Sequence, residues 1–243
     1  MQRPIISAKE ALDDIRSGLD HAALMRKYNL SVKGLTSLLE KLSAQGLLDV
    51  TEIRGGMPLP DQILSLRNHV TGEVIFRGAA PTIKDLVELA VQSGEYLGEA
   101  DLSGANLSGV EAEGADLSES YLYQANLQRA HLAHAKLFRA ELSEANLAGA
   151  ALTGADLSEA NLTGADFFQA DLVEAVLFRA NFDKANLESA NLRGSDLREA
   201  RFVDAKLTKT DLTGADLSAA EFGNGDLSSA VTSGAKSDVA DLT

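Results

Sequence analysis

The side chains that could bind a metal ion in this sequence are its four histidines and its 36 acidic residues. His131 and His134 are the closest pair of histidines, and imidazole is a common zinc ligand. Both flank Leu132, a member of a regular apolar series, so we expect both rings to point into solvent. His21 and His69 have no potential partner nearby in the sequence. We therefore expect no metal site and no cofactor.

Motifs for catalysis are also missing from the sequence. It contains no glycine-rich phosphate loop, no nucleophile elbow and no metalloprotease motif. The absence of cysteine excludes a disulfide and a thiolate metal site. The Asp and Glu residues recur at regular intervals instead of gathering in one segment. We therefore expect that the protein is not an enzyme.

The acidic residues recur because the chain repeats every five residues from 97 to 242. The series of positions 97, 102, 107 and onward contains 30 sites, of which 23 are leucine and four are phenylalanine. Alanine stands two residues earlier in 24 of the 30 pentads, and Asn or Asp often directly precedes the leucine. Such a strict period predicts a repeat architecture.

A period of five fits neither a helix nor a flat strand. Residues five apart wander around the surface of a helix, and they alternate between the two faces of a strand. The leucines can point to one axis only if the chain turns a corner in every pentad. Asn, Asp, Ser and Gly at the polar positions favour such turns. The sequence therefore predicts a solenoid whose coils stack through backbone hydrogen bonds.

The repeat resembles the pentapeptide-repeat family, whose motif is Ala-(Asp/Asn)-Leu-x-x, as in Ala105-Asn106-Leu107 and Ala155-Asp156-Leu157. The resemblance implies a mainly β fold, namely a right-handed quadrilateral β-helix with four pentads per coil. The 30 pentads would then form about 7.5 coils. The predicted core includes Leu107, Leu157, Phe182, Phe202 and Phe222. The last three are twenty residues apart, so they would stack on one face of the interior.

Residues 1–50 lack the repeat and show helical periodicity instead. Three short helices, with a turn before the third, resemble a helix-turn-helix or winged-helix domain. The candidate DNA-contacting residues on the third helix are Lys33, Thr36, Ser37 and Lys41. However, residues 1–95 contain 11 basic and 12 acidic residues, whereas a DNA reader usually has a basic surface. Docking or dimerisation is the alternative role, and we do not expect nucleic acid as a partner.

The segment between this helical domain and the repeats divides into two parts. Residues 51–72 include Gly55, Gly56, Pro58 and Pro60, which predicts a linker. Residues 73–95 predict a strand at 73–77 and an amphipathic helix at 82–93. Because a solenoid end exposes unpaired edges and apolar core, we expect this strand and helix to cap the β-helix at 96–243.

The net charge of −14 falls almost entirely within the repeats. Residues 96–243 contain 11 basic and 24 acidic residues, a net charge of −13. Such a surface repels DNA phosphates and membranes and could attract a basic protein groove. The chain begins MQRPIISAKEALDD, which is not a signal peptide, and it has no apolar run of membrane-spanning length. We therefore expect a cytoplasmic protein with no membrane partner.

Five aromatic residues adjacent to the interior series are predicted to be exposed. They are Tyr121, Tyr123, Phe138, Phe168 and Phe178. Coils of four pentads would align Phe138 and Phe178 in one column, two coils apart. Exposed aromatic residues at positions that usually hold Ser or Thr predict a protein-contact patch.

Three functions are compatible with the sequence. The first is a non-catalytic scaffold that binds an unidentified protein partner through the acidic rod. The second is implied by the resemblance, because well-understood family members mimic DNA, bind type II topoisomerases such as gyrase and protect them from quinolones. The third is a transcriptional regulator that acts through the N-terminal domain. The C-terminal end has no capping helix and could pair with a second copy to form a homodimer.

Overall fold

The computed structural model describes residues 7–17, 19, 21–28, 30, 32–44, 47–48, 63–223 and 227–238. The chain divides into two units. One comprises Met1–Leu64 and Arg77–Leu86, and the other comprises Ser65–Phe76 and Val87–Thr243. The helices belong mainly to the first unit and the repeats to the second.

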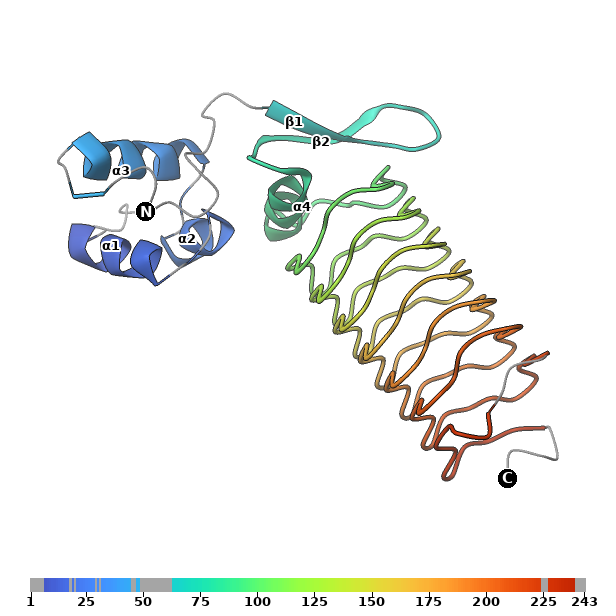
Figure 1. The fold of residues 1–243 in the computed structure, drawn as a ribbon. Helices are drawn as coiled ribbons and strands as arrows, with labels where there is room; N and C mark the ends of the chain where they lie inside the picture. The colour runs from blue at the N-terminus through green and yellow to red at the C-terminus, as the bar shows by residue number, and fades with distance from the viewer. Residues whose placement is uncertain are drawn as a thin grey trace. The chain divides into compact units, whose positions relative to one another are not determined.

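Three helices precede the repeats: α1 (Ala8–Arg16), α2 (His21–Tyr28) and α3 (Val32–Ala44) (Figure 1). Their apolar residues recur every three or four positions and therefore form one buried stripe per helix. The resulting core consists of Ala11, Leu12, Ile15, Leu24, Tyr28, Leu35, Leu39, Leu42 and Leu48. On the surface, the ammonium of Lys27 lies 2.7 Å from the carboxylate of Asp14. The hydrogen bond from Lys27 is the main reason why the pKa of Asp14 is lowered.

The repeats form coils of twenty residues. Parallel bridges join residues twenty apart along the repeats, for example Asp156 and Val176. The backbone N–H of Leu157 donates to the carbonyl of Val176 at 2.8 Å, and the same pattern recurs from coil to coil. Since twenty residues contain four pentads, the coil has the size that the sequence predicts. Figure 1 shows these coils stacked side by side.

Each pentad turns its corner at the second residue after the leucine. In nearly all of the described pentads this residue has a positive φ, whether it is a glycine such as Gly154 (φ 65°) or another residue such as Glu159 (φ 57°). Glycine adopts this region without strain, whereas other residues need support from the surrounding structure. A hydrogen bond of 3.1 Å from the N–H of Ala160 to the carbonyl of Leu157 closes the turn. The corners direct leucine and alanine inward and leave four polar outer faces.

The interior of the coils is filled by the leucine and phenylalanine series. Leu107, Leu157, Phe182 and Phe202 are buried, with at most 2% of their surface exposed. The ring centroids of Phe182 and Phe202 lie 5.1 Å apart, and those of Phe202 and Phe222 are also 5.1 Å apart. Phe222 is only half-buried, in contrast to its predicted core position. Among the described rings, it stacks on one side only, against Phe202.

A β-hairpin precedes the first coil and begins within the segment that was predicted to be a linker. Its strands are β1 (Ile63–Arg67) and β2 (Val74–Ala79), so the second half of the 51–72 linker prediction is wrong. The error arose because the Gly and Pro residues that suggested a linker all precede residue 61. Residues 51–62 lie outside the described residues. The carbonyl of Arg67 accepts a hydrogen bond from the N–H of Asp101 at 2.7 Å, so β1 provides a partner for the first coil.

Helix α4 (Ile83–Gln92) provides a second partner for the first coil through a buried carboxylate. Glu88 is 2% exposed, and its Oε1 accepts a hydrogen bond from the backbone N–H of Glu111 at 3.0 Å. One coil later, the equivalent N–H, that of His131, donates to the carbonyl of Val110 at 2.8 Å. The side chain of Glu88 therefore takes the place of the carbonyl that a preceding coil would provide.

We predict that Glu88→Leu destabilises the repeat region more than Glu88→Gln does. Leucine leaves the N–H of Glu111 without this acceptor, which costs about 1–3 kcal/mol for a buried group, whereas the glutamine carbonyl can still accept the hydrogen bond. Urea unfolding followed by circular dichroism measures both free energies of unfolding. If the free energy of unfolding falls equally in the two variants, the Glu88 side chain does not cap the first coil through this hydrogen bond.

Candidate functional site

Among the described repeats, one outer face has more of the ion pairs than the other faces together, and we call it the ladder face. It consists of the outward residues of the pentads centred on positions 97, 117, 137, 157, 177, 197 and 217. Each pentad contributes one row of the face. Parallel bridges such as Asp116↔Lys136 join neighbouring rows. The rows therefore follow one another at the strand spacing of about 4.8 Å.

Acidic and basic rows alternate along the middle of the ladder face. In chain order, the first of these rows contains Asp116 and Glu119, the second Lys136 and Arg139, and the third Asp156 and Glu159. The fourth row contains Arg179, and the fifth contains Asp196, Arg198 and Glu199. Arg139 Nε lies 2.7 Å from the Glu159 carboxylate, and Arg179 Nε lies 2.7 Å from that of Glu199. Lys136 Nζ lies 3.2 Å from the carboxylate of Asp116. These ion pairs connect each basic row to an acidic neighbour.

Two phenylalanine rings lie among these ion pairs. The guanidinium of Arg139 lies 4.8 Å from the centroid of Phe138, and that of Arg179 lies 4.7 Å from the centroid of Phe178. Arg198 approaches Phe178 from the next row at 5.6 Å. These are distances at which a guanidinium is attracted to an aromatic face. The face therefore contains two similar aromatic and arginine groups, separated by two coils.

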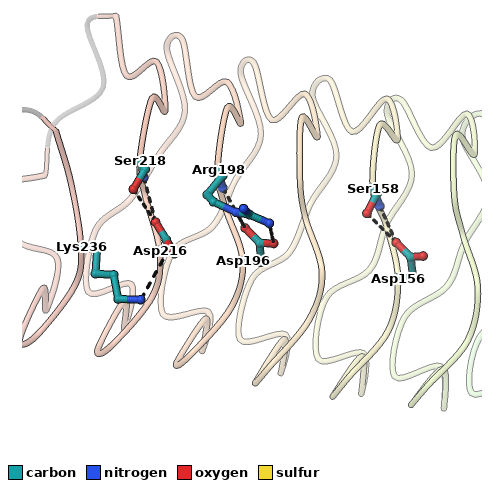
Figure 2. Close-up of polar contacts among 7 residues, drawn as sticks. All are labelled: Asp156, Ser158, Asp196, Arg198, Asp216, Ser218 and Lys236. Carbon is teal, nitrogen blue, oxygen red and sulfur yellow. Dashed lines mark hydrogen bonds and ion pairs between the residues drawn. The ribbon is translucent and has the colours of Figure 1, made fainter.

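The aspartates of the ladder face also accept hydrogen bonds from the residue two positions later and so stabilise the turn. Asp156 accepts hydrogen bonds from the backbone N–H and the hydroxyl of Ser158, at 3.0 and 2.6 Å. At the same position two coils later, Arg198 replaces the serine and donates through Nε and Nη2 to Asp196, both at 2.7 Å. Figure 2 shows both arrangements, and a third at Asp216. The aspartate of the motif is thus a turn-forming residue as well as a surface charge.

These hydrogen bonds lower the pKa values of two aspartates. The pKa of Asp196 is lowered, mainly by the hydrogen bond from Arg198, and burial opposes this effect. The pKa of Asp216 is lowered, mainly by the hydrogen bond from the hydroxyl of Ser218, again against the effect of burial. Both shifts favour the charged form of the carboxylate.

The five predicted contact residues do not form one patch. Tyr121 and Tyr123 lie on the face that follows the ladder face around the coil, Phe138 and Phe178 lie on the ladder face, and Phe168 lies on a third face. Phe168 is 37% exposed, and the other four are half-buried. The prediction of a single patch is wrong because residues of different pentads share a face only if their pentads are twenty residues, or a multiple of twenty, apart.

A pocket of about 430 Å³ lies where the β1–β2 turn meets the first coils. It is lined by His69, Val70, Thr71, Glu99, Glu119, Arg139 and Glu141. The ring of His69 stacks on Tyr121, with centroids 5.6 Å apart and an angle of 16° between the planes. Nothing in the sequence indicated this pairing, because 51 positions separate the two residues.

The other residues singled out from the sequence are not brought together. His131 and His134 are exposed, and His131 Nδ1 lies 3.4 Å from the carboxylate of Glu111. Within the described part of the chain, no group of three His, Cys, Asp or Glu residues has an arrangement that could hold a metal ion. No helix among the described residues is both long and apolar enough to cross a membrane.

The candidate DNA-contacting residues all belong to α3. Lys41 is exposed and Ser37 is half-buried, whereas the side chains of Lys33 and Thr36 lie outside the described part. The structure places three helices in this region, but DNA recognition by α3 stays a prediction.

We predict that the repeat region loses stability as the pH falls below about 4, the usual range for an aspartate. A carboxylate whose pKa is lower in the folded state stabilises the fold at higher pH, and this contribution disappears as the pH falls through the folded pKa. Asp196→Asn should therefore reduce the loss of thermal stability between neutral and acidic pH. The control is Glu113→Gln, at an exposed residue on a different face. If the thermal stability of Asp196→Asn depends on pH as that of the unmodified protein does, the stabilising role of the Asp196 carboxylate is contradicted.

Comparison with known proteins agrees with the coil geometry. The pentapeptide repeats family matches in eight copies, over residues 100–137, 140–177, 160–198 and 195–231. No curated protein gives a significant match to the chain.

Solved structures of pentapeptide-repeat proteins are also similar to this chain. A trypsin-treated form of QnrB1, a plasmid-mediated fluoroquinolone resistance protein, is 23% identical over 57% of this chain and 79% of its own, with a TM-score of 0.41. HetL, involved in heterocyst differentiation regulation in the cyanobacterium Nostoc sp. strain PCC 7120, is 29% identical over 61% of this chain and 80% of its own, with a TM-score of 0.33. A pentapeptide repeat protein of the Arabidopsis thaliana thylakoid lumen is 39% identical over 46% of this chain and 65% of its own, with a TM-score of 0.27.

All three TM-scores lie below 0.5, so these structures do not identify a partner for this chain. The family match covers more than half of the 243 residues, and its repeats coincide with the coils of twenty residues. The chain belongs to the pentapeptide-repeat family.

Proposed function

We propose that this protein is a non-catalytic scaffold that binds another protein through the ladder face of its β-helix. The observation that carries the proposal is the pair of aromatic and arginine groups at Phe138 and Phe178. Arginine and aromatic side chains are enriched among the residues that dominate binding energy at protein interfaces. The coil interior is filled by leucine, phenylalanine and alanine, which leaves the outer faces for recognition.

The fold does not require phenylalanine at these two positions. The same column holds Ser118, Ser158 and Ser218 in other coils, and each of these hydroxyls donates to the aspartate two residues earlier. Phenylalanine cannot make that hydrogen bond, so it adds apolar surface without supporting the turn. In the free protein, the arginines partly cover the two rings, which are half-buried. Recognition is a simple reason for keeping such residues on an outer face.

The charge of the ladder face also suits a protein partner. Between residues 136 and 199, the face has four bases (Lys136, Arg139, Arg179 and Arg198) and four acids (Asp156, Glu159, Asp196 and Glu199). This stretch is therefore neutral on a chain with a net charge of −14. A partner can approach it without having to be strongly basic, and opposite charges can set its register.

DNA mimicry is the second candidate, and the acidity of the repeats favours it. A mimic needs a continuous negative surface to fill a groove that is shaped for phosphates. Residues 125–210 contain ten bases against twelve acids, so the negative charge is concentrated toward the two ends of the repeats. The arginines of the ladder face would meet a basic groove with like charge. The scaffold therefore fits the observed charges better than a mimic that binds topoisomerase.

We predict that Phe138→Ser/Phe178→Ser loses its protein partner while the repeats stay folded, because serine is the residue that the same column uses elsewhere. The measurement is affinity capture from an extract of the native cells, with bound proteins identified and quantified by mass spectrometry. Phe168→Ser, on another face, is the matched control. A partner lost equally in both variants, or in neither, would contradict binding through the ladder face.

A further inference from the structure

The alternating rows of the ladder face are complementary to the same rows turned end to end. We propose that this face pairs with the ladder face of a second copy of the chain, with the two rods antiparallel. The inference deepens the proposed function, because it names a partner for the same face. It rests on the order of charges along the face and on the constant spacing of the coils.

The constant spacing makes a second copy a good geometric match. Rows of the ladder face recur at the strand spacing of about 4.8 Å, so a partner must present charges at the same interval to meet several rows at once. A second copy of the same β-helix has rows at this same spacing. Once one row is aligned with a row of the second copy, all the others along the face are aligned as well.

The order of the charges selects the antiparallel arrangement. If the rods were parallel, each row would face its own equivalent, and Arg139 would meet the basic row of the second copy. A two-fold axis that lies along the strand direction reverses the order of the rows and keeps each column opposite itself. Symmetric pairing of this kind is the commonest form of self-association among soluble proteins.

One register brings opposite charges together over four consecutive rows. With the axis between the Lys136 row and the Asp156 row, Lys136 faces Asp156 of the second copy and Arg139 faces Glu159 of the second copy. In the neighbouring rows, Glu119 faces Arg179 of the second copy. By symmetry each of these three contacts occurs twice. The bases then have acidic neighbours both along their own rod and across the interface.

The side chains have room and hydrogen-bonding capacity for these additional contacts. The side chains of Arg139 and Arg179 are 55% and 54% exposed, and that of Lys136 is 63% exposed. Arg139 uses Nε for its contact with Glu159, and a guanidinium has five N–H donors in total. Burial of the Phe138 and Phe178 rings would add an apolar contribution to the pairing.

A charge-exchange experiment tests this inference. One variant, Lys136→Glu/Arg139→Glu, makes a basic row acidic, and the other, Asp156→Lys/Glu159→Lys, makes an acidic row basic. Light scattering at high micromolar concentration should give about twice 25.7 kDa for the unmodified chain and 25.7 kDa for each variant alone. An equimolar mixture of the two variants should recover the doubled mass, because all four central rows then face opposite charges again.

The matched control is Lys206→Glu/Lys209→Glu, which makes the same charge changes at the same pentad positions on a different face. This variant should keep the doubled mass. Recovery of the dimer in the mixture also shows that both charge variants are folded. A monomeric unmodified chain would overturn the inference. So would variants that stay dimeric alone, which would place self-association elsewhere, for example at the C-terminal end, or folded variants whose mixture stays monomeric.

The light-scattering experiment and the capture experiment on Phe138 and Phe178 can fail independently of each other. If the unmodified chain is monomeric and a different protein is still captured through the two rings, the self-pairing fails and the proposed function stands. If the chain dimerises through this face and the two rings prove irrelevant to capture of any other protein, the self-pairing stands and the wider scaffold role fails.

Discussion

Every feature of the repeat region depends on one backbone constraint, the hydrogen bonding of each coil to the next at a separation of about twenty residues. The N–H of Leu157 reaches the carbonyl of Val176, and this pattern fixes four corners per coil. Because all coils have the same length, residues twenty apart are forced into columns on the outside. The columns allow Arg139 and Glu159 to pair and give the ladder face its regular rows.

The same constraint creates a problem at the start of the rod, since the first coil has no predecessor to accept its N–H groups. Two different segments solve it. The carbonyl of Arg67 in β1 accepts from Asp101, and the buried carboxylate of Glu88 in α4 accepts from Glu111. A backbone carbonyl and a side-chain carboxylate thus perform the same task. Both acceptor residues, Arg67 and Glu88, belong to the same unit as the coils.

Sequence reasoning predicted the parts of the structure that arise from local chemistry. The period of five placed Leu157 and Phe182 in the core because it describes which residues can point inward. It failed where contacts join distant segments, as for β1 and for the stack of His69 on Tyr121. The contact patch was partly wrong for the same reason, because Phe168 and Phe138 lie on different faces. The alternation of charges at intervals of twenty was visible in the sequence and could have indicated the ladder face.

The central claim is that the ladder face is a protein-contact surface, and site-specific photocrosslinking tests it most directly. A photoreactive phenylalanine derivative at Ser158 fits a column that already accepts phenylalanine at positions 138 and 178. The control is the same derivative at Thr153, the corresponding pentad position on the neighbouring face. In intact cells, we expect a discrete crosslinked protein, either a second copy or a different partner, from position 158 and none from position 153. Equal crosslinking at both positions, or none at 158, would contradict the account.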